Sequence, residues 1–259
     1  MKEKILNKLN ELEAEHGFRI LYACESGSRA WGFASADSDY DVRFLYAWPT
    51  EKYLSVYEPT DQMDWEIDAD ELDFSAWEIR KALGLFRKSN GSLMEWLHSP
   101  IVYREDPEVM ARWRKLATEC FVPKNSAAHY LGLSKGMWLR MQEAGATVTA
   151  KKYLYVLRSM LAARFVVENQ SPVPVEFEKL RGALELPGEV TTAIMKMVEA
   201  KSHGNESDVI GGVPVLSQFV ESELQRLAEL SSDLPDQLCD IVLLDEFFRS
   251  VIGVSIQEG

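Results

Sequence analysis

The first half of the chain alternates between short apolar runs and polar turns. Residues 2–16 carry isoleucine and leucine at helical spacing and end before Gly17, a residue suited to a left-handed stop, so they predict a helix. The apolar runs at 18–24 and 40–48 have the length of strands. They flank a segment rich in Gly and Ser at 25–39. This order predicts a strand, a functional loop and a second strand.

Two further short runs follow Pro49. Residues 63–67 and 71–74 predict two strands joined by the acidic turn DAD, a hairpin that extends the same sheet. From Ala76 the apolar residues recur at intervals of three and four, which predicts helices interrupted at Asn90-Gly91. The small sheet therefore ends near residue 75.

Beyond residue 105 the pattern is almost wholly helical. Breaks at Pro, Gly and polar stretches such as Pro123, Gly145 and HGNES separate the helices. The predicted helices span residues 107–119, 125–143, 148–169, 188–203, 215–231 and 235–251. We therefore predict an α+β fold in which a small mixed sheet with flanking helices occupies the N-terminal half, and an all-helical half follows.

Composition limits the classes of protein to which this chain can belong. Apolar residues make up 46% of the chain, and no run of about 18 uncharged apolar residues could cross a bilayer. The N-terminus lacks the apolar core and cleavage site of a secretory signal, so we expect a cytoplasmic protein. The net charge of -13 opposes strong non-specific binding to nucleic acid. An acidic protein that handles nucleotide phosphates would need a metal ion to offset the repulsion.

The three cysteines, Cys24, Cys120 and Cys239, lie far apart in the sequence. They form neither a CxxC metal motif nor an even-numbered disulfide framework. We therefore expect three buried thiols.

The most informative stretch pairs Gly27-Ser28 with Asp39-Tyr40-Asp41, which follow after ten intervening residues at the start of an apolar strand. Because side chains alternate along a strand, Asp39 and Asp41 are predicted to point to the same side. Two neighbouring carboxylates repel each other unless a hard divalent cation lies between them. A glycine after a strand lets backbone N–H groups face a phosphate, and Ser28 adds a hydroxyl donor. The pattern predicts a site for metal-assisted nucleotidyl transfer.

A third carboxylate would complete a two-metal site and could orient or deprotonate an acceptor hydroxyl. Asp73 is our choice, because it lies in a strand-like run directly before a helix. Glu66, on the preceding strand, is the alternative. Magnesium suits such oxygen ligands, and manganese is the alternative ion.

The segment ESGSRAWGFASADSDYDVRFLY resembles the signature of polymerase-beta-like nucleotidyltransferases. Together with LDFSAWEIRKAL, LMEWLHSPIVYRED and KKYLYVLRSMLAARF, it is similar to bacterial predicted nucleotidyltransferases of the YcgL type, which include the RNA-repair-associated RlaP branch. This resemblance implies a nucleotidyltransferase-type sheet. The pattern of elements predicts a catalytic domain at 1–104 and a helical domain at 105–259 that closes over the nucleotide site. The same resemblance implies metal binding by Asp39, Asp41 and Asp73, and phosphate contact by Gly27 and Ser28.

Basic and aromatic residues near these motifs are candidate nucleotide contacts. Arg43 shares strand parity with the two aspartates and could offset their charge, although a structural salt bridge fits its position equally well. Lys151, Tyr155 and Arg158 recur at intervals of four and three and would share one helix face, either gripping a triphosphate or forming an exposed basic face with Tyr in the core. The predicted nucleotide-binding residues are Gly27, Ser28, Arg29, Lys81, Lys151, Lys152, Tyr155 and Arg158.

We therefore predict an enzyme that moves a nucleoside monophosphate from an NTP such as ATP to a hydroxyl, with release of pyrophosphate. The acceptor would be an RNA end, a protein side chain or a small molecule. The alternative is a nucleotide-binding module or antitoxin-like partner without turnover, which the acidic composition favours. A third hypothesis is metal-dependent hydrolysis.

Overall fold

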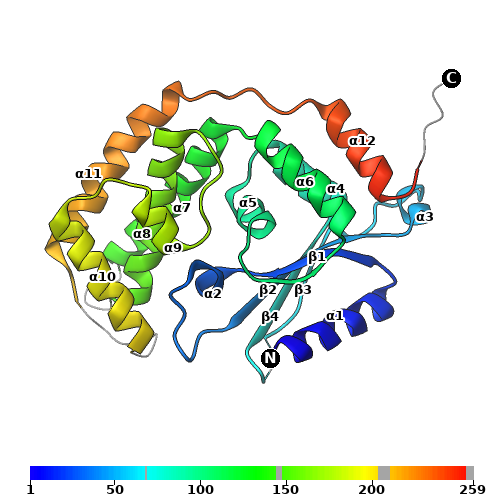
Figure 1. Cartoon of the computed structure of the whole chain (residues 1–259), viewed down its shortest axis with the longest axis horizontal. Helices are drawn as coiled ribbons and strands as arrows, with labels where there is room; N and C mark the ends of the chain where they lie inside the picture. Colours follow the sequence, from blue (N-terminus) through cyan, green and yellow to red (C-terminus); the bar gives the residue numbers. More distant parts are fainter. Residues whose placement is uncertain (68, 144–147, 204–210, 255–259) are drawn as a thin grey trace. The chain divides into compact units, whose positions relative to one another are not determined.

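The computed structural model describes residues 1–67, 69–143, 148–203 and 211–254 (Figure 1). Three predicted features fall wholly or partly outside these residues: the acidic turn at 68–70, the break at Gly145 and most of the HGNES stretch. The chain divides into two compact units, each described by itself below. The first comprises Met1–Gly27, Asp39–Phe121 and the chain from Leu238; the second comprises Ser28–Ser38 and Val122–Gln237.

The first unit is built on a five-stranded mixed sheet, which confirms the predicted α+β class. Its strands are β1 (Arg19–Glu25), β2 (Tyr40–Ala47), β3 (Gln62–Asp64), β4 (Leu72–Glu78) and β5 (Val102–Glu105), in the order β3-β4-β2-β1-β5. β2 and β4 run parallel, and the other neighbouring pairs are antiparallel. β1 is buried along nearly its whole length, because both faces of the sheet are covered at this strand.

Helices cover the two faces of this sheet. On one face α1 (Lys2–His16) buries Ile5, Leu9 and Leu12 against apolar side chains of the strands, including Phe44. Gly17 ends this helix in a left-handed conformation, as its position predicts. The other face belongs to a second apolar cluster, contributed by the helices α4 (Ile79–Arg87), α5 (Gly91–Leu97), α6 (Pro107–Glu119) and α12 (Ile241–Val251).

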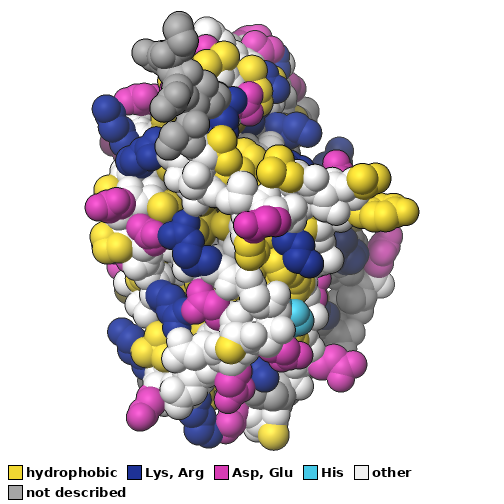
Figure 2. Space-filling view, turned by 90° about the vertical axis from the view of Figure 1, so that its right-hand side faces the viewer, with side chains coloured by type: hydrophobic (Ala, Val, Ile, Leu, Met, Phe, Trp, Pro, Cys, Tyr) yellow, Lys and Arg dark blue, Asp and Glu magenta, His cyan; other side chains and the backbone are white. Residues whose placement is uncertain are grey.

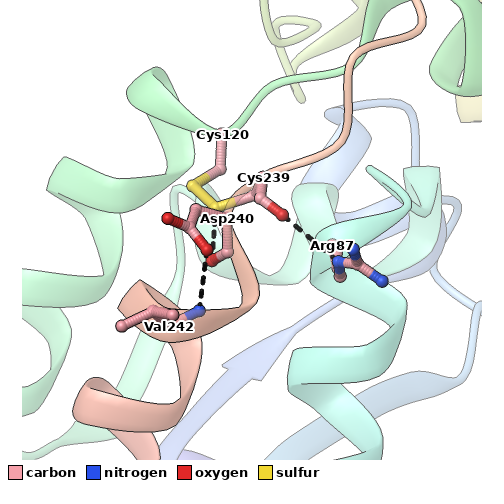
Figure 3. Close-up of a disulfide and its surroundings, with 5 residues drawn as sticks. All are labelled: Arg87, Cys120, Cys239, Asp240 and Val242. Carbon is pink, nitrogen blue, oxygen red and sulfur yellow. Dashed lines mark hydrogen bonds between the residues drawn. A yellow bond between two sulfur atoms is a disulfide. The ribbon is translucent and has the colours of Figure 1, made fainter.

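A disulfide joins two of the cysteines in the first unit (Figure 3). Cys120 is the C-cap of α6, and Cys239 comes directly before Asp240, the N-cap of α12. The expectation of three thiols is wrong, because the fold brings together two residues that are 119 positions apart. Arg87 Nε donates to the carbonyl of Cys239 at 3.2 Å. Cys24 is a free, buried thiol.

The second unit is helical. Its helices are α7 (Pro123–Glu143), α8 (Ala150–Asn169), α9 (Phe177–Gly182), α10 (Gly188–His203) and α11 (Pro214–Leu230), followed by a 3-10 turn at Ser231–Asp233. α8 is the core helix, since most of its residues are buried. The short helix α2 (Gly27–Trp31) begins at the last residue of the first unit and continues into the second.

Periodicity predicted the long elements and missed the short ones. The predicted helices at 107–119, 188–203 and 215–231 match α6, α10 and α11 within one residue at either end. β5, α2, α3 (Thr50–Tyr53) and α9 are too short for a hydrophobic period to reveal, and none of them was predicted. β4 extends to Glu78, four residues beyond the prediction.

Charged and apolar side chains are mixed on the surface. On the face drawn in Figure 2, basic side chains lie scattered among acidic and apolar ones. Leu54, Val56 and Tyr57, which follow α3, are among the most exposed apolar side chains. Within the described residues, no helix has the length and apolarity needed to span a membrane.

Candidate active site

The turn after β1 brings the glycine of the Gly-Ser motif against Asp41. Gly27 has a positive φ of 58°, and a Cβ added there would lie 1.9 Å from Asp41 Oδ2. The N–H of Ser26 also donates to the carbonyl of Asp41 at 2.8 Å. Only glycine fits here, for its conformation and for the space it leaves. Ser28, the next residue, is buried at the start of the second unit.

The parallel pairing of β2 with β4 places Asp73 beside Asp41 in the sheet. Arg43 lies between the two carboxylates: its Nη2 is 2.8 Å from Asp41 Oδ1 and 2.7 Å from Asp73 Oδ2. Its Nη1 donates to the carbonyl of Asp73 at 2.8 Å. About a quarter of each carboxylate side chain is exposed, so solvent reaches the pair.

Asp39 and Glu66 differ from Asp73 in their placement. Asp39 is exposed and lies just before β2, which begins at Tyr40. The prediction that Asp39 and Asp41 point to the same side assumed that both lie within one strand, and Asp39 lies outside β2. Glu66 is exposed and lies beyond the end of β3 at Asp64. Within the described residues, no three side chains of His, Cys, Asp or Glu form a group that could hold a metal ion. The fold thus gathers Asp41 and Asp73, with Arg43 between them.

Glu25 supports this arrangement and was missed by the sequence analysis. It is buried at the end of β1, where its Oε1 accepts the N–H of Asp41 at 2.8 Å. The hydroxyl of Tyr103 donates to Glu25 Oε2, and Ser99 Oγ donates to the carbonyl of Glu25 at 2.6 Å. Burial and the adjacent Glu25 raise the pKa of Tyr103, so its hydroxyl keeps its proton and remains a donor. The available signal was an acidic residue that ends an apolar run two positions before Gly27.

Two further polar side chains, Ser75 and Asp64, lie on the paired strands β4 and β3. Ser75, which pairs with Arg43 in the β2–β4 register, donates its hydroxyl to Asp64 Oδ1 at 2.6 Å. This hydrogen bond lowers the pKa of Asp64. Burial raises the pKa of the Cys24 thiol, on neighbouring β1, to about 12, which argues against a cysteine nucleophile here.

Lys81 lies near the opposite end of β4 from Asp73. Its Nζ donates to Gln62 Oε1 at 2.8 Å and lies 3.3 Å from Asp61 Oδ1. Gln62 pairs with Trp77, four residues along β4 from Asp73. The fold therefore does not bring Lys81 to the carboxylate pair.

In the second unit, Arg29 and Lys201 hold the loop that precedes Asp39. Arg29 Nη2 donates to the carbonyl of Ser38 at 2.6 Å. Lys201, buried on α10, donates to the hydroxyls of Ser35 and Ser38, each at 3.2 Å. The sequence offered no signal for Lys201, because its partners lie 166 and 163 residues away in the chain.

The basic and aromatic residues of α8 separate into two groups. Lys151, Lys152 and Tyr155 line a cavity of about 660 Å³, whose other lining residues are Met137, Arg140, Met141 and Thr149. Arg158 is buried instead, with its guanidinium 4.3 Å from the centre of the Trp31 ring and Nη2 donating to the carbonyl of Val175. The predicted shared face thus provides Lys151 and Tyr155 to the cavity and Arg158 to the core.

Comparisons with known proteins give this geometry a context. The model of a family described as RlaP, RNA repair pathway DNA polymerase beta family, matches residues 1–250. The uncharacterized protein YcgL of Bacillus subtilis (strain 168) is 40% identical over 241 residues, which cover 93% of this chain and 92% of that protein. A crystal structure of a nucleotidyltransferase-like protein from Exiguobacterium sibiricum 255-15 aligns with 93% of this chain and 77% of its own. The two chains share 10% sequence identity, and the TM-score is 0.30.

Proposed function

The chain belongs to the RNA repair pathway DNA polymerase beta family, RlaP, and on this premise we propose that it is a metal-dependent nucleotidyltransferase. Family membership supports nucleotidyl transfer as the class of reaction. The observation that carries the assignment to particular residues is that Gly27 lies against Asp41, which pairs with Asp73 on the neighbouring strand. We further propose a hydroxyl at an RNA end as the acceptor, in keeping with the name of the family.

The donor set fits a divalent metal ion in its chemistry. Asp41 and Asp73 provide carboxylate oxygens, the hard ligands that magnesium and manganese prefer. Asp39 lies just before β2, the strand that carries Asp41. These three residues would hold the ion, which would neutralise charge on the nucleotide phosphates. Because Gly27 has no side chain, the turn can lie against Asp41, whose Oδ2 would be 1.9 Å from a Cβ at that position. The N–H groups of this turn are proposed to bind phosphate.

The chain's own groups then have defined tasks. Backbone N–H groups at Gly27 and Ser28 bind the β- and γ-phosphates, which holds the α-phosphate next to the carboxylates. The oxygen of the acceptor hydroxyl forms a bond to the α-phosphorus, and Asp73 accepts the proton of that hydroxyl. The bond between the α-phosphorus and the bridging oxygen breaks, and pyrophosphate leaves.

Lys151, Lys152 and Tyr155 are proposed to bind nucleotide at the α8 cavity. Two ammonium groups and an aromatic ring at one cavity suit a phosphate and a base, and Arg140 adds a third cation. Arg29, Lys81 and Arg158 are engaged in the contacts described above. Their predicted roles in nucleotide binding stay predictions.

The direct test is transfer of label from α-labelled NTP to RNA by Asp41→Asn. Loss of one carboxylate charge should reduce transfer by more than about 100-fold, since even outer-shell partners of metal sites contribute 10- to 100-fold. Asp245→Asn changes an exposed acid on α12 and is the matched control. Wild-type labelling by Asp41→Asn would reject the assignment.

One observation favours the second candidate, a nucleotide-binding module without turnover. Arg43 donates a hydrogen bond to one oxygen of Asp41 and to one oxygen of Asp73. Within the described residues, no third His, Cys, Asp or Glu side chain forms a metal-binding group with these two carboxylates. Calorimetry with NTP, combined with a pyrophosphate assay over RNA, protein and small-molecule acceptors, separates the two. Binding without pyrophosphate release would support the module.

A further inference from the structure

Arg43 is the cation that the fold itself places between the two proposed metal ligands. One guanidinium nitrogen, Nη2, contacts both Asp41 and Asp73, at 2.8 and 2.7 Å. The Arg43 side chain is 16% exposed, less than either carboxylate. The pair therefore carries an internal counter-ion in a partly buried position, where charge interactions are stronger than in bulk water.

The backbone keeps the guanidinium in this place. Nη1 donates to the carbonyl of Asp73 at 2.8 Å and to that of Val42 at 3.3 Å. Arg43 thus has bonds that do not depend on the carboxylates, and they would hold its charge in place when another cation arrives.

The two carboxylate oxygens of Asp41 face different neighbours. Arg43 takes Oδ1, whereas Oδ2 is the atom that a Cβ on Gly27 would meet at 1.9 Å. Arg43 therefore orients Asp41 so that its second oxygen faces the turn proposed to hold phosphate. A divalent ion bound there would meet the positive charge of Arg43 nearby, and a bound triphosphate would offset both charges.

We propose that Arg43 is a positioning residue that couples metal binding to nucleotide binding. Its charge opposes binding of a free divalent ion to Asp41 and Asp73, so the ion binds well only together with the negatively charged triphosphate. This proposal rests on the proposed function, because it takes Asp41 and Asp73 to be metal ligands. Coupling of this kind is reciprocal: the ion strengthens nucleotide binding by the same factor.

The test measures Mn²⁺ binding to the full chain by electron paramagnetic resonance, with and without a non-hydrolysable ATP analogue. Wild type should bind Mn²⁺ weakly alone and at least about 10-fold more tightly with the analogue, within the usual range of coupling between sites. Arg43→Gln should bind Mn²⁺ alone about 10-fold more tightly than wild type, and the analogue should add less, since the same coupling is lost. Arg43→Lys keeps the charge and should retain weak binding of Mn²⁺ alone.

The sign of the change separates this role from a structural one. An arginine that only held the strands together would, when replaced, leave Mn²⁺ binding weaker or unchanged, and that result in a folded Arg43→Gln overturns the coupling. Thermal melting establishes that the variant is folded, and Arg43→Met is a second neutral variant if glutamine impairs folding.

Asp41→Asn distinguishes failure of this proposal from failure of the proposed function. If Asp41→Asn binds Mn²⁺ with the analogue as tightly as wild type does, the metal site itself is misassigned and the coupling falls with it. If Asp41→Asn loses Mn²⁺ but Arg43→Gln does not bind it more tightly, only the coupling is overturned.

Discussion

At Gly27 a backbone turn lies directly against the carboxylate of Asp41. Two independent constraints act there, a left-handed φ of 58° and the oxygen of Asp41 at the place of a missing Cβ. The first constraint concerns the conformation of one residue, and the second concerns the candidate active site. A substitution can therefore test the two separately.

Gly27→Ala should abolish nucleotidyl transfer and lower the free energy of unfolding by more than the usual cost of a left-handed alanine, about 1–2 kcal/mol. The added carbon requires Asp41 or the turn to move, because 1.9 Å is far inside contact distance. Label transfer from NTP and denaturant unfolding are the two measurements.

Gly17→Ala is the matched control for Gly27→Ala. Gly17 has a φ of 72°, but a Cβ added there would have nothing within 4 Å. This variant should lose about 1–2 kcal/mol of stability and keep transfer activity. Equal activity in the two variants would show that the Gly27 turn has no part in catalysis.

At the scale of single elements, the junction of β4 and α4 depends on a buried acid. Glu78 ends β4 and caps α4, accepting the N–H groups of Arg80 and Lys81 at 2.8 and 3.3 Å. The hydroxyl of Tyr53 donates to its other oxygen. Burial nevertheless raises the pKa of Glu78, because desolvation of the carboxylate outweighs these hydrogen bonds.

This raised pKa predicts a pH dependence of stability. Folded Glu78 binds a proton at a higher pH than unfolded Glu78, whose pKa is about 4.3, so the folded state gains stability as the pH falls toward that value and loses it as the pH rises through the folded pKa. Glu78→Gln removes this dependence. The unfolding free energy of wild type minus that of Glu78→Gln should therefore rise on acidification from about pH 7 to about pH 4.5.

Glu246→Gln, an exposed position on α12, serves as the matched control for the pH series. Chemical denaturation of the three proteins over the same pH values measures the differences. A difference between wild type and Glu78→Gln that stays flat or falls on acidification would contradict the assigned effect of burial.

At the scale of the whole molecule, the disulfide occupies a particular place in the chain. Cys120 comes just before Val122, where the second unit resumes, and Cys239 comes just after Gln237, where that unit ends. The bond therefore ties together the two chain segments that flank this helical part. It also fixes α12 to α6 within the first unit (Figure 3).

Reduction of the disulfide should lower stability by about 2–4 kcal/mol, the typical contribution of a bond that closes a long loop. The measurement is denaturant unfolding with and without dithiothreitol. The double variant Cys120→Ala with Cys239→Ala should be insensitive to the reductant. Thiol labelling of the unfolded protein should detect one cysteine before reduction and three after it. If wild type is equally stable with and without reductant, the bond does not stabilise the fold.

The sequence by itself determined the features that depend on near neighbours. Hydrophobic periodicity located α1, β1, β2 and the long helices, because a period needs only residues a few positions apart. The same local logic predicted the stop at Gly17 and a small sheet followed by helices. It also selected Gly27 and Asp41, which the fold brings into contact.

Only the tertiary structure decided which distant groups meet. Asp73, rather than Glu66, lies beside Asp41 because β4 pairs with β2 in parallel, and no local pattern sets the register between strands so far apart in the chain. The same holds for the Cys120–Cys239 bond and for Glu25 with Tyr103. Arg158 lies in the core although its spacing suited the cavity face, since packing against Trp31 decides its position. Long-range packing selects these contacts, and a sequence pattern reports only short-range preference.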